Sequence, residues 1–539
     1  MLHPDQRRHA LVHLDERFDL VVVGGGITGC GVLLDACQRG LRVLLLERAD
    51  LASGTSSRSS KLIHGGLRYL KQMQFRVTRS ACRERDRMMG LNPDLVRPIR
   101  FLYPAYESDR TPGWQVDLGL WMYDQLTDRP EKHERLTGAA ARELVPGLGV
   151  EDLDRALVYT DAMADDAALT LAVAATGLAY GGRIVTRAEV VEGLRDGDGR
   201  VTGVVFRDLE TGESHRAEGH LVVNATGVWV DQVREAFGLE TLRLRPSRGS
   251  HIVVPGDRLP LGAAVTVPSP DDGRPVFFIP HPEGVLLGTT DLFHDGPLDD
   301  PRPTRDEVGY LLRAVQERFP ARGIGEGDVV GAFAGVRPIL SSAAEVPSAA
   351  SREEAVWDER GLLSVAGGKL TTWRPMAEEV VDEALRLLPE ERSHLAGPCR
   401  TEGTPLAGLA PLDLPERLEA AHDLAPAVAQ GMARRLRADA WWAPVLARDG
   451  GELRPLADGT DLTVAEVRVH LRLGGVVRLE DLLLRRARVG MWRPELAREL
   501  GARLRAPCRE ELGWDHPRWD RELERFERAL EGWTLGGVR

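Results

Sequence analysis

A glycine-rich turn between a buried strand and a helix constrains the fold of this chain more than any other feature. Residues 19–23, Asp-Leu-Val-Val-Val, form a short apolar run that predicts a buried parallel strand. The run ends at Gly24-x-Gly26-x-x-Gly29, and apolar residues then recur at helical spacing. Residues 42–46 form a second apolar run. This order predicts a βαβ unit and therefore an α/β fold with a parallel sheet.

The turn suits a dinucleotide cofactor. Without side chains at Gly24, Gly26 and Gly29, backbone N–H groups and the positive end of the helix can face a pyrophosphate. Glu47 ends the second strand, where a carboxylate accepts hydrogen bonds from a ribose and disfavours the 2′-phosphate of NADP. This motif alone leaves the choice between FAD and NAD open.

Two later strands also end in small residues. Residues 221–223 precede Ala225 and Gly227, and residues 362–365 precede Gly367 and Gly368. A long extended cofactor that crosses several such strand ends favours FAD over NAD. The hydroxyl-rich segment after the second strand adds further candidate cofactor ligands, which are Thr55, Ser56, Ser60 and Lys61.

The sequence pattern that indicates secondary structure changes twice along the chain. Short strands such as residues 276–279 and 285–287, separated by Pro and Gly turns, predict an antiparallel sheet interleaved with the parallel one. After about residue 397 amphipathic helical patterns predict a small all-α domain, with capping-box spacing from Thr463 to Glu466. We expect an FAD-binding domain over 17–105, 150–235 and 330–395, a substrate-binding domain over 106–149 and 236–329, and a helical domain over 396–539.

The charge is unevenly distributed. The chain has 70 Lys+Arg and 82 Asp+Glu, a net charge of −12, whereas residues 396–539 contain 23 Arg, no Lys and 23 Asp+Glu. The whole deficit therefore lies in the first 395 residues. This negative net charge of the first 395 residues, which we call the body, argues against a basic nucleic-acid-binding protein. An anionic substrate would need local Arg or Lys side chains.

Cysteine usage and the N-terminus indicate a cytoplasmic protein. The five cysteines are odd in number, widely spaced and form no C-x-x-C pair, which argues against a disulfide framework or a zinc site. The first residues lack the apolar core of a signal peptide, and no stretch of about 20 apolar residues predicts a membrane span. We expect no metal site.

Two stretches, residues 21–29 and 55–70, resemble the FAD-dependent, aerobic-type glycerol-3-phosphate dehydrogenases. Shorter matches support the resemblance, at residues 248–251, 287–291, 335–338, 367–372 and 479–486. The resemblance implies a flavin Rossmann domain, an antiparallel substrate domain and a C-terminal helical domain. It also implies oxidation of sn-glycerol 3-phosphate to dihydroxyacetone phosphate, with electrons passed from FAD to a membrane quinone. Arg248 departs from the lysine that the family usually has at that position.

The same resemblance implies roles for individual residues. Arginine pairs bidentately with phosphate, so Arg68 and Arg337 are expected on the substrate phosphate. His251 is the candidate proton acceptor, because an imidazole with a pKa near ~6.5 suits base catalysis at neutral pH, and His64 is the second candidate. The remaining expectations are Tyr69, Arg352 and Lys369 at the substrate, a catalytic part for Arg337 and Lys369, and Asp291 and Thr371 at the cofactor.

Two groups of arginines in the C-terminal part lie beside tryptophans, a composition found where proteins meet anionic lipid headgroups. The groups are Arg434, Arg435 and Arg437 beside Trp441 and Trp442, and Arg485, Arg486 and Arg488 near Trp492. This predicts peripheral membrane contact through the helical domain, although a solvated helix face with core tryptophans explains the same pattern. A homodimer is a further expectation.

Three other functions compete with the quinone-linked dehydrogenase. A glycerol-3-phosphate oxidase would use the same flavin with oxygen as the acceptor. An amine or amino-acid oxidoreductase of the wider flavin superfamily shares the glycine motif but needs no pair of arginines on a phosphate. A non-catalytic nucleotide-sensing module would bind FAD or NAD without reducing it.

Overall fold

The glycine-rich turn lies between β1 (Phe18–Val23) and α2 (Ile27–Gln38), and α2 leads into β2 (Val43–Glu47), which confirms the predicted βαβ unit. The strands β1 and β2 pair in parallel. Alternate residues of β1 enter two cores: Leu20 and Val22 pack on the side of α2, and Val21 and Val23 pack on the opposite face. Burial on both faces explains why the strand is a continuous apolar run.

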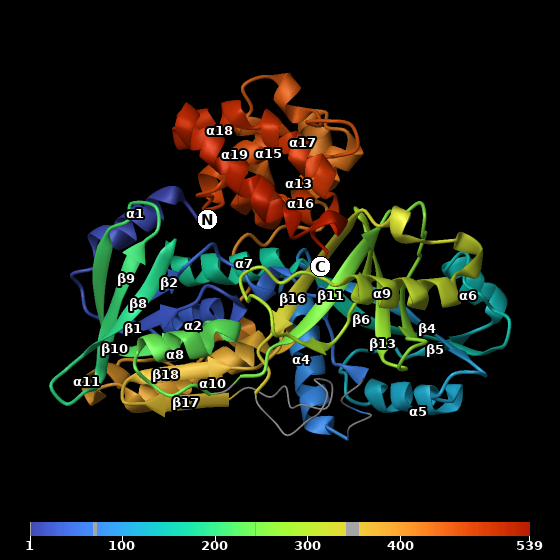
Figure 1. The fold of residues 1–539 in the computed structure, drawn as a ribbon, viewed down its shortest axis with the longest axis horizontal. Helices are drawn as coiled ribbons and strands as arrows, with labels where there is room; N and C mark the ends of the chain where they lie inside the picture. The colour runs from blue at the N-terminus through green and yellow to red at the C-terminus, as the bar shows by residue number, and fades with distance from the viewer. Residues whose placement is uncertain (1, 68–69, 71–72, 243, 341–354, 539) are drawn as a thin grey trace.

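The computed structural model describes residues 2–67, 70, 73–242, 244–340 and 355–538. Figure 1 shows two sheets side by side, with the C-terminal helices lying across both. We call this helical part, residues 414–538, the cap. The mixed architecture confirms the predicted fold class, an α/β flavin domain interleaved with an antiparallel sheet and followed by helices.

The first sheet has a parallel centre and an antiparallel extension. Its strand order is β17-β18-β10-β1-β2-β7, and β9 pairs with both β8 and β10. The helices α2, α7 and α10 share one hydrophobic core on one face of the sheet. The additional elements are β7 (Arg183–Thr186), β8 (Ala188–Arg195), β9 (Val201–Asp208), β10 (Ser214–Asn224), β17 (Ala355–Glu359), β18 (Leu362–Ala366), α1 (Pro4–Val12), α7 (Asp166–Ala179), α8 (Val230–Ala236) and α10 (Trp373–Leu387).

The second sheet is mainly antiparallel, in the order β15-β11-β14-β13-β12-β4-β6-β3, with β16 beside β11 and β5 beside β6. Its strands are β3 (Leu62–Ile63), β4 (Val96–Tyr106), β5 (Glu134–Leu136), β6 (Leu153–Ala164), β11 (Ser247–Val254), β12 (Ala264–Pro268), β13 (Pro275–His281), β14 (Gly284–Gly288), β15 (Leu292–Phe293) and β16 (Gly331–Arg337). The helices between them are α4 (Phe75–Leu91), α5 (Gly113–Asp124), α6 (Gly138–Leu144) and α9 (Arg305–Arg318).

The two sheets are interleaved more finely along the chain than the sequence suggested. The strands β3, β4, β6 and β16 pair in the second sheet, although they fall within the ranges predicted for the FAD-binding domain. An apolar strand carries no local mark of the sheet it joins, because that choice depends on distant pairing partners. The domain boundaries therefore stay a prediction.

The C-terminal cap is helical throughout its described residues, apart from loops and isolated bridges. Thr463 is the N-cap of α15, since its Oγ1 accepts from the backbone N–H of Glu466 at 3.1 Å. The carboxylate of Glu466 binds Arg435, so the structure shows one half of the predicted capping box. None of the described helices has the length and apolar character needed to cross a bilayer. The helices after α10 are α11 (Glu390–Ser393), α12 (Leu414–His422), α13 (Pro426–Leu436), α14 (Trp442–Leu446), α15 (Val464–Leu473), α16 (Val489–Trp492), α17 (Pro494–Arg503), α18 (Arg505–Leu512) and α19 (His516–Glu531).

The arginines beside the cap's tryptophans are engaged within the protein. Arg434 pairs with Glu283 at 2.6 Å, and Arg437 pairs with Asp94 at 2.8 Å. Arg435 binds Glu466 and Asp461, and the second arginine group is buried together with Trp492. These arginines therefore form ion pairs within the protein, and the predicted membrane contact through the helical domain stays a prediction.

Buried charges and an apolar cluster join the cap to the body. Arg486 binds Asp50 at 2.6 and 2.9 Å, Arg485 binds the same carboxylate, and Arg187 of the body binds Asp481. Beside these pairs, side chains of the second sheet and of the cap share one hydrophobic core. Breaking a buried ion pair leaves a charge without its partner, which is costly.

We expect the substitution Asp50→Asn to destabilise the cap by about 3 kcal/mol, because it leaves two buried arginines without their shared carboxylate. Thermal or urea unfolding would measure the loss. The control is Glu499→Gln, which breaks an exposed pair with Arg503 and should change the stability by less than about 0.5 kcal/mol. Equal shifts in both variants would contradict a stabilising role for the buried junction.

Candidate functional site

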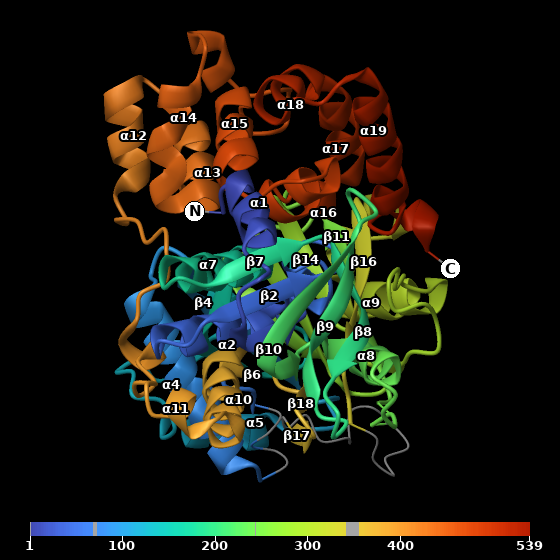
Figure 2. The ribbon, with the colours of Figure 1, turned by 90° about the vertical axis from the view of Figure 1, so that its left-hand side faces the viewer.

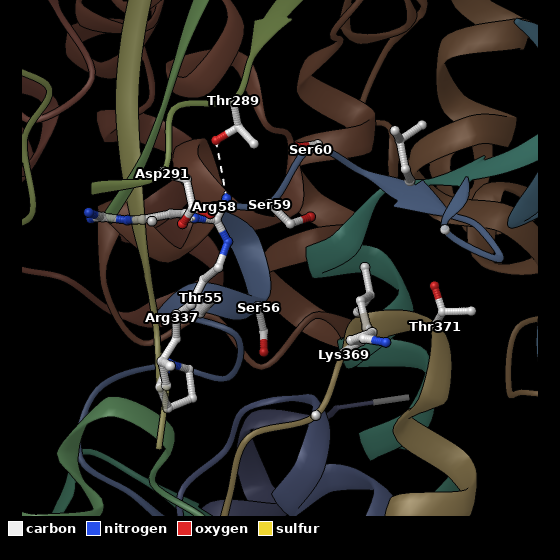
Figure 3. Close-up of a pocket in the computed structure, with 18 of the residues that line it drawn as sticks. Thr55, Ser56, Arg58, Ser59, Ser60, Thr289, Asp291, Arg337, Lys369 and Thr371 are labelled. Atoms are coloured by element: carbon white, nitrogen blue, oxygen red, sulfur yellow. Dashed lines mark hydrogen bonds and ion pairs between the residues drawn. The ribbon is translucent and has the colours of Figure 1, made fainter. Parts of the chain in front are cut away.

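One large cavity, about 1070 Å³, lies along the carboxyl ends of the first sheet and reaches the second sheet. It receives most of the side chains and glycines that the sequence predicted for the site. These are Gly24, Gly26, Glu47, Thr55, Ser56, Ser60, His64, Ala225, Gly227, His251, Asp291, Arg337, Gly367, Gly368, Lys369 and Thr371. Part of this set is drawn in Figure 3.

At the glycine turn, backbone segments approach one another too closely for a side chain to fit between them. A Cβ at Gly24 would lie 2.7 Å from the carbonyl oxygen of Ala225, so no side chain fits between the ends of β1 and β10. A Cβ at Gly29 would lie 1.9 Å from the carbonyl oxygen of Gly24. Gly29 does not line the cavity, and its role is to let α2 approach the turn. The start of α2 thereby faces the cavity, which fits a pyrophosphate.

Glu47 lies at the end of β2 and lines the same cavity. Its carboxylate accepts from the backbone N–H groups of Gly25 and Ala49, both at 2.6 Å. Burial raises the pKa of Glu47, although these two hydrogen bonds oppose the rise. The carboxylate is thus fixed by the turn itself, and hydrogen bonding to a ribose stays a prediction.

The segment after β2 bends around the opening of the cavity. Ser56 Oγ accepts from the backbone N–H of Ile27 at 2.9 Å, which ties the segment to the start of α2. Thr55 and Ser60 face the cavity, but Lys61 does not: its side chain is fully buried and its Nζ binds Asp166 at 2.8 Å. The predicted contact of Lys61 with the cofactor therefore finds no support in the geometry, because a buried ammonium needs a carboxylate partner.

Arg337 ends β16 at the side of the cavity formed by the second sheet. Its Nη1 donates to Asp291 Oδ1 at 3.3 Å and its Nη2 donates to Thr289 Oγ1 at 3.2 Å (Figure 3). Asp291 also accepts from Ser247 Oγ at 2.6 Å. Asp291 therefore orients the guanidinium of Arg337. The predicted contact of Asp291 with the cofactor stays a prediction.

Lys369 and Thr371 follow β18 and approach the cavity from the first sheet (Figure 3). Thr371 Oγ1 accepts from the backbone N–H of His64 at 3.2 Å, which fixes the segment after β3 against the start of α10. The cavity thus has an arginine from one sheet and a lysine from the other, with hydroxyl groups between them. Both cations are local exceptions to the anionic body.

His251 lies in β11, where its Nε2 is 2.8 Å from Ser60 Oγ and its ring stacks on Phe333 at 4.9 Å. Burial, with Arg337 and Lys61 nearby, lowers the pKa of His251 to about 3. The neutral imidazole is therefore the populated form at neutral pH, which corrects the expectation of an ordinary pKa. Its Nδ1 has no hydrogen-bond partner among the described residues.

Several cavity residues were given no role from the sequence. Arg48 lies over the ring of Trp229 at 5.4 Å, and both line the cavity although they are far apart in the chain. Arg58 also lines the cavity; burial lowers its pKa to about 10, and it lies over the ring of Trp533 at 5.0 Å. Thr289 was part of a recognised motif without an assigned role.

Three predicted substrate residues, Arg68, Tyr69 and Arg352, lie outside the described residues. Their assignment stays a prediction.

Comparisons with known proteins agree with this geometry. The family model for FAD-dependent oxidoreductases matches residues 19–383. The glycerol-3-phosphate dehydrogenase of Mycobacterium leprae is 37% identical over 555 residues, which cover 99% of this chain and 92% of that protein. The solved FAD complex of the glycerol-3-phosphate dehydrogenase from Bacillus halodurans superposes with a TM-score of 0.80 and 28% identity, covering 99% of this chain and 98% of the other.

A more distant solved structure shares the fold alone. The FAD-bound L-α-glycerophosphate oxidase of Mycoplasma pneumoniae is 22% identical with a TM-score of 0.52, and covers 69% of this chain and 95% of its own. The family match, the full-length relative and the glycine-lined cavity lead to one conclusion. This chain belongs to the FAD-dependent glycerol-3-phosphate dehydrogenase family, and its cofactor is FAD.

Proposed function

We propose that this chain oxidises sn-glycerol 3-phosphate to dihydroxyacetone phosphate and passes the electrons to a membrane quinone. The observation that carries the substrate is the guanidinium of Arg337 at the cavity, oriented by Asp291 and Thr289. The names of the full-length relatives support the same substrate. An amine substrate would leave this oriented arginine without an anion to bind. A carboxylate of an amino acid would also fit it, so the choice of a phosphate rests on Arg337 together with the named relatives.

Phosphate binding depends on local charge. The contacts of Arg337 to Asp291 and Thr289 are long, and 24% of its side-chain surface remains exposed. A phosphate is more strongly charged than a hydroxyl group and matches the planar fork of an arginine. The net charge of −12 therefore does not prevent binding, because contact distance decides the interaction.

Oxidation removes a hydride from the carbinol carbon and a proton from its hydroxyl group. FAD supplies the acceptor for the hydride when it is bound. We place the proton path at Ser60 and His251: Ser60 Oγ takes the substrate proton while its own proton moves to Nε2 of His251, 2.8 Å away. Because the pKa of the buried imidazole is lowered, His251 holds this proton only transiently. Lys369 stabilises negative charge that develops at the cavity. His64, at the same cavity, is the second candidate for the base.

A quinone acceptor requires contact with a membrane, and the exposed face of α4 and α5 suits it better than the cap. On α5, Trp114, Leu118 and Trp121 are 54%, 49% and 54% exposed and lie on one side of the helix. The two acidic residues of α5 are buried. Exposed tryptophan and leucine on one helix face fit the interfacial layer of a bilayer.

The adjacent helix supplies the positive charge that an anionic membrane attracts. On α4, Arg76, Arg79 and Arg83 are exposed, and no acidic residue lies between Phe75 and Arg83. Arg85 of α4 donates to Tyr123 of α5 at 3.0 Å and thereby joins the two helices.

Both helices lie at the end of the molecule away from the cap (Figure 1, Figure 2). The inner side of α5 contributes Val116, Gly119 and Met122 to the cavity. The exposed side of α5 is therefore separated from the cavity by this one helix.

An oxidase that uses oxygen is the second candidate. Oxygen needs no membrane face, so the exposed face of α4 and α5 favours the quinone. Oxygen uptake measured with and without a soluble quinone analogue separates the two acceptors. A homodimer remains part of the proposal, and its test is the mass of the protein in solution.

We expect anaerobic glycerol 3-phosphate to bleach the visible band of the bound flavin, and Arg337→Lys to require at least about tenfold more substrate. The loss of charge-assisted hydrogen bonds, roughly 1.5–3 kcal/mol, corresponds to this change in apparent affinity. FAD content should be unchanged. The control is Arg313→Lys at an exposed pair with Asp271. Bleaching by amino acids and not by glycerol 3-phosphate would refute the proposed substrate.

The maximal rate of flavin reduction should show no inflection from His251 near pH 6.5. Because the pKa of His251 is lowered to about 3, the neutral acceptor form stays populated throughout pH 5–8. Stopped-flow rates at saturating substrate would measure this. We expect His251→Ala to lower the rate by about 10²–10⁴-fold with FAD still bound. A wild-type rate in His251→Ala would exclude His251 as the base.

The protein should float with vesicles that contain phosphatidylglycerol, and higher salt should weaken the binding. Replacement of Arg76, Arg79 and Arg83 by Gln should lower binding about fivefold per residue, since each basic side chain contributes roughly 1 kcal/mol. The control is Trp441→Ser with Trp442→Ser, two half-exposed tryptophans of the cap. Loss of binding only in the control would assign the contact to the cap, and no flotation of the wild type would argue against a membrane face.

A further inference from the structure

A buried carboxylate behind the cavity accepts hydrogen bonds from two distant parts of the chain. Asp166, at the start of α7, is fully buried. Its Oδ2 accepts from the backbone N–H and the Oγ of Ser59 at 2.9 and 2.7 Å. Its Oδ1 accepts from Lys61 Nζ and from Arg488 Nη2, both at 2.8 Å. Asp166 therefore holds the 57–61 segment from the side away from the cavity.

Arg488 carries this contact into the C-terminal cap. It precedes α16 in the left-handed region, with φ of +63°, and its side chain is 6% exposed. Besides Asp166, the guanidinium binds Asp165 at 2.8 Å and the carbonyl oxygen of Ser57 at 3.2 Å. A single arginine of the cap thus binds both the carboxylate and the backbone of the segment that lines the cavity.

A second set of contacts joins the segment to the cap. Trp533 packs on Phe333 with ring centroids 5.1 Å apart, and Phe333 stacks on His251. The guanidinium of Arg58 lies over the Trp533 ring. The segment between Ser57 and Lys61 is therefore held at two points by side chains of the cap, and Ser60 projects from it to His251.

We propose that Arg488 is a positioning residue, through which the C-terminal cap fixes the 57–61 segment and so sets the contact between Ser60 and His251. The catalytic consequence rests on the function proposed above. The structural consequence, an ordered segment, does not depend on it.

The chemistry of the contact explains the use of arginine. Two carboxylates, Asp165 and Asp166, face two cations, Lys61 and Arg488, so the group is electrically balanced, and only Asp165 is partly exposed. Burial by itself would raise the pKa of Asp166, but Lys61 and Arg488 hold it below its usual value. A lysine at position 488 would keep the charge but could not reach Asp165, Asp166 and Ser57 together, because it lacks the planar fork.

The test compares Arg488→Ala and Arg488→Lys with the control Arg468→Ala in the full-length protein. Arg468 is equally buried and binds Glu452, Glu510 and Glu511, all within the cap. Hydrogen exchange of the peptide that covers residues 57–63 should become roughly tenfold faster in Arg488→Ala and remain unchanged in Arg468→Ala. This readout needs neither substrate nor turnover.

Stopped-flow measurements on the FAD-loaded proteins provide the second readout. We expect the maximal rate of flavin reduction to fall about 10–100-fold in Arg488→Ala, as a small misplacement of reacting groups does. The substrate concentration at half-maximal rate should change by less than about threefold, because the contacts of Arg337 are untouched. Arg488→Lys should give intermediate values for both readouts.

The outcomes separate the inference from the proposed function. Unchanged exchange of residues 57–63 in Arg488→Ala would overturn the positioning role, whatever the enzyme oxidises. Faster exchange with a wild-type rate of flavin reduction would overturn its link to catalysis. A wild-type protein that glycerol 3-phosphate does not reduce would refute the proposed function and leave the exchange test valid. If Arg488→Ala does not fold, Arg488→Lys provides the same comparison.

Discussion

The close approach of backbone to backbone at the end of β1 is the constraint on which the site depends. Gly29 lets α2 press against the carbonyl of Gly24, and Gly24 in turn meets Ala225 at the end of β10. Two strand ends and one helix start therefore converge without intervening side chains, which leaves N–H groups and the helix dipole to face an anionic cofactor. A side chain at either glycine would separate these elements before it affected any catalytic group.

Charge is organised locally in this protein. The body is anionic as a whole, yet Arg337 and Lys369 face the cavity from two different sheets. Several arginines of the cap are instead used in buried or half-buried ion pairs with carboxylates, such as those of Asp50, Asp94 and Asp166. The net charge of a segment therefore says little about its ligands, because neighbouring side chains at contact distance dominate the electrostatic energy.

These contacts explain how the helical cap is attached to the rest of the protein. It shares a hydrophobic core with the second sheet and binds the first sheet through buried ion pairs, so it joins the two halves that form the cavity. Its Arg488 and Trp533 lie behind the segment that carries Ser60. The cap therefore bridges the two sheets, and none of its described residues lines the cavity.

Local sequence patterns were sufficient to predict the βαβ unit, the glycine turn, the small-residue strand ends and the N-cap residue of α15. Each of these depends on residues close together in the chain. Only the tertiary structure decided which sheet β3, β4, β6 and β16 join, since strand pairing is a long-range choice. It also decided that Lys61 binds Asp166 and that His251 has a lowered pKa. Both results come from burial and from charges brought together by folding, and no spacing along the chain encodes them.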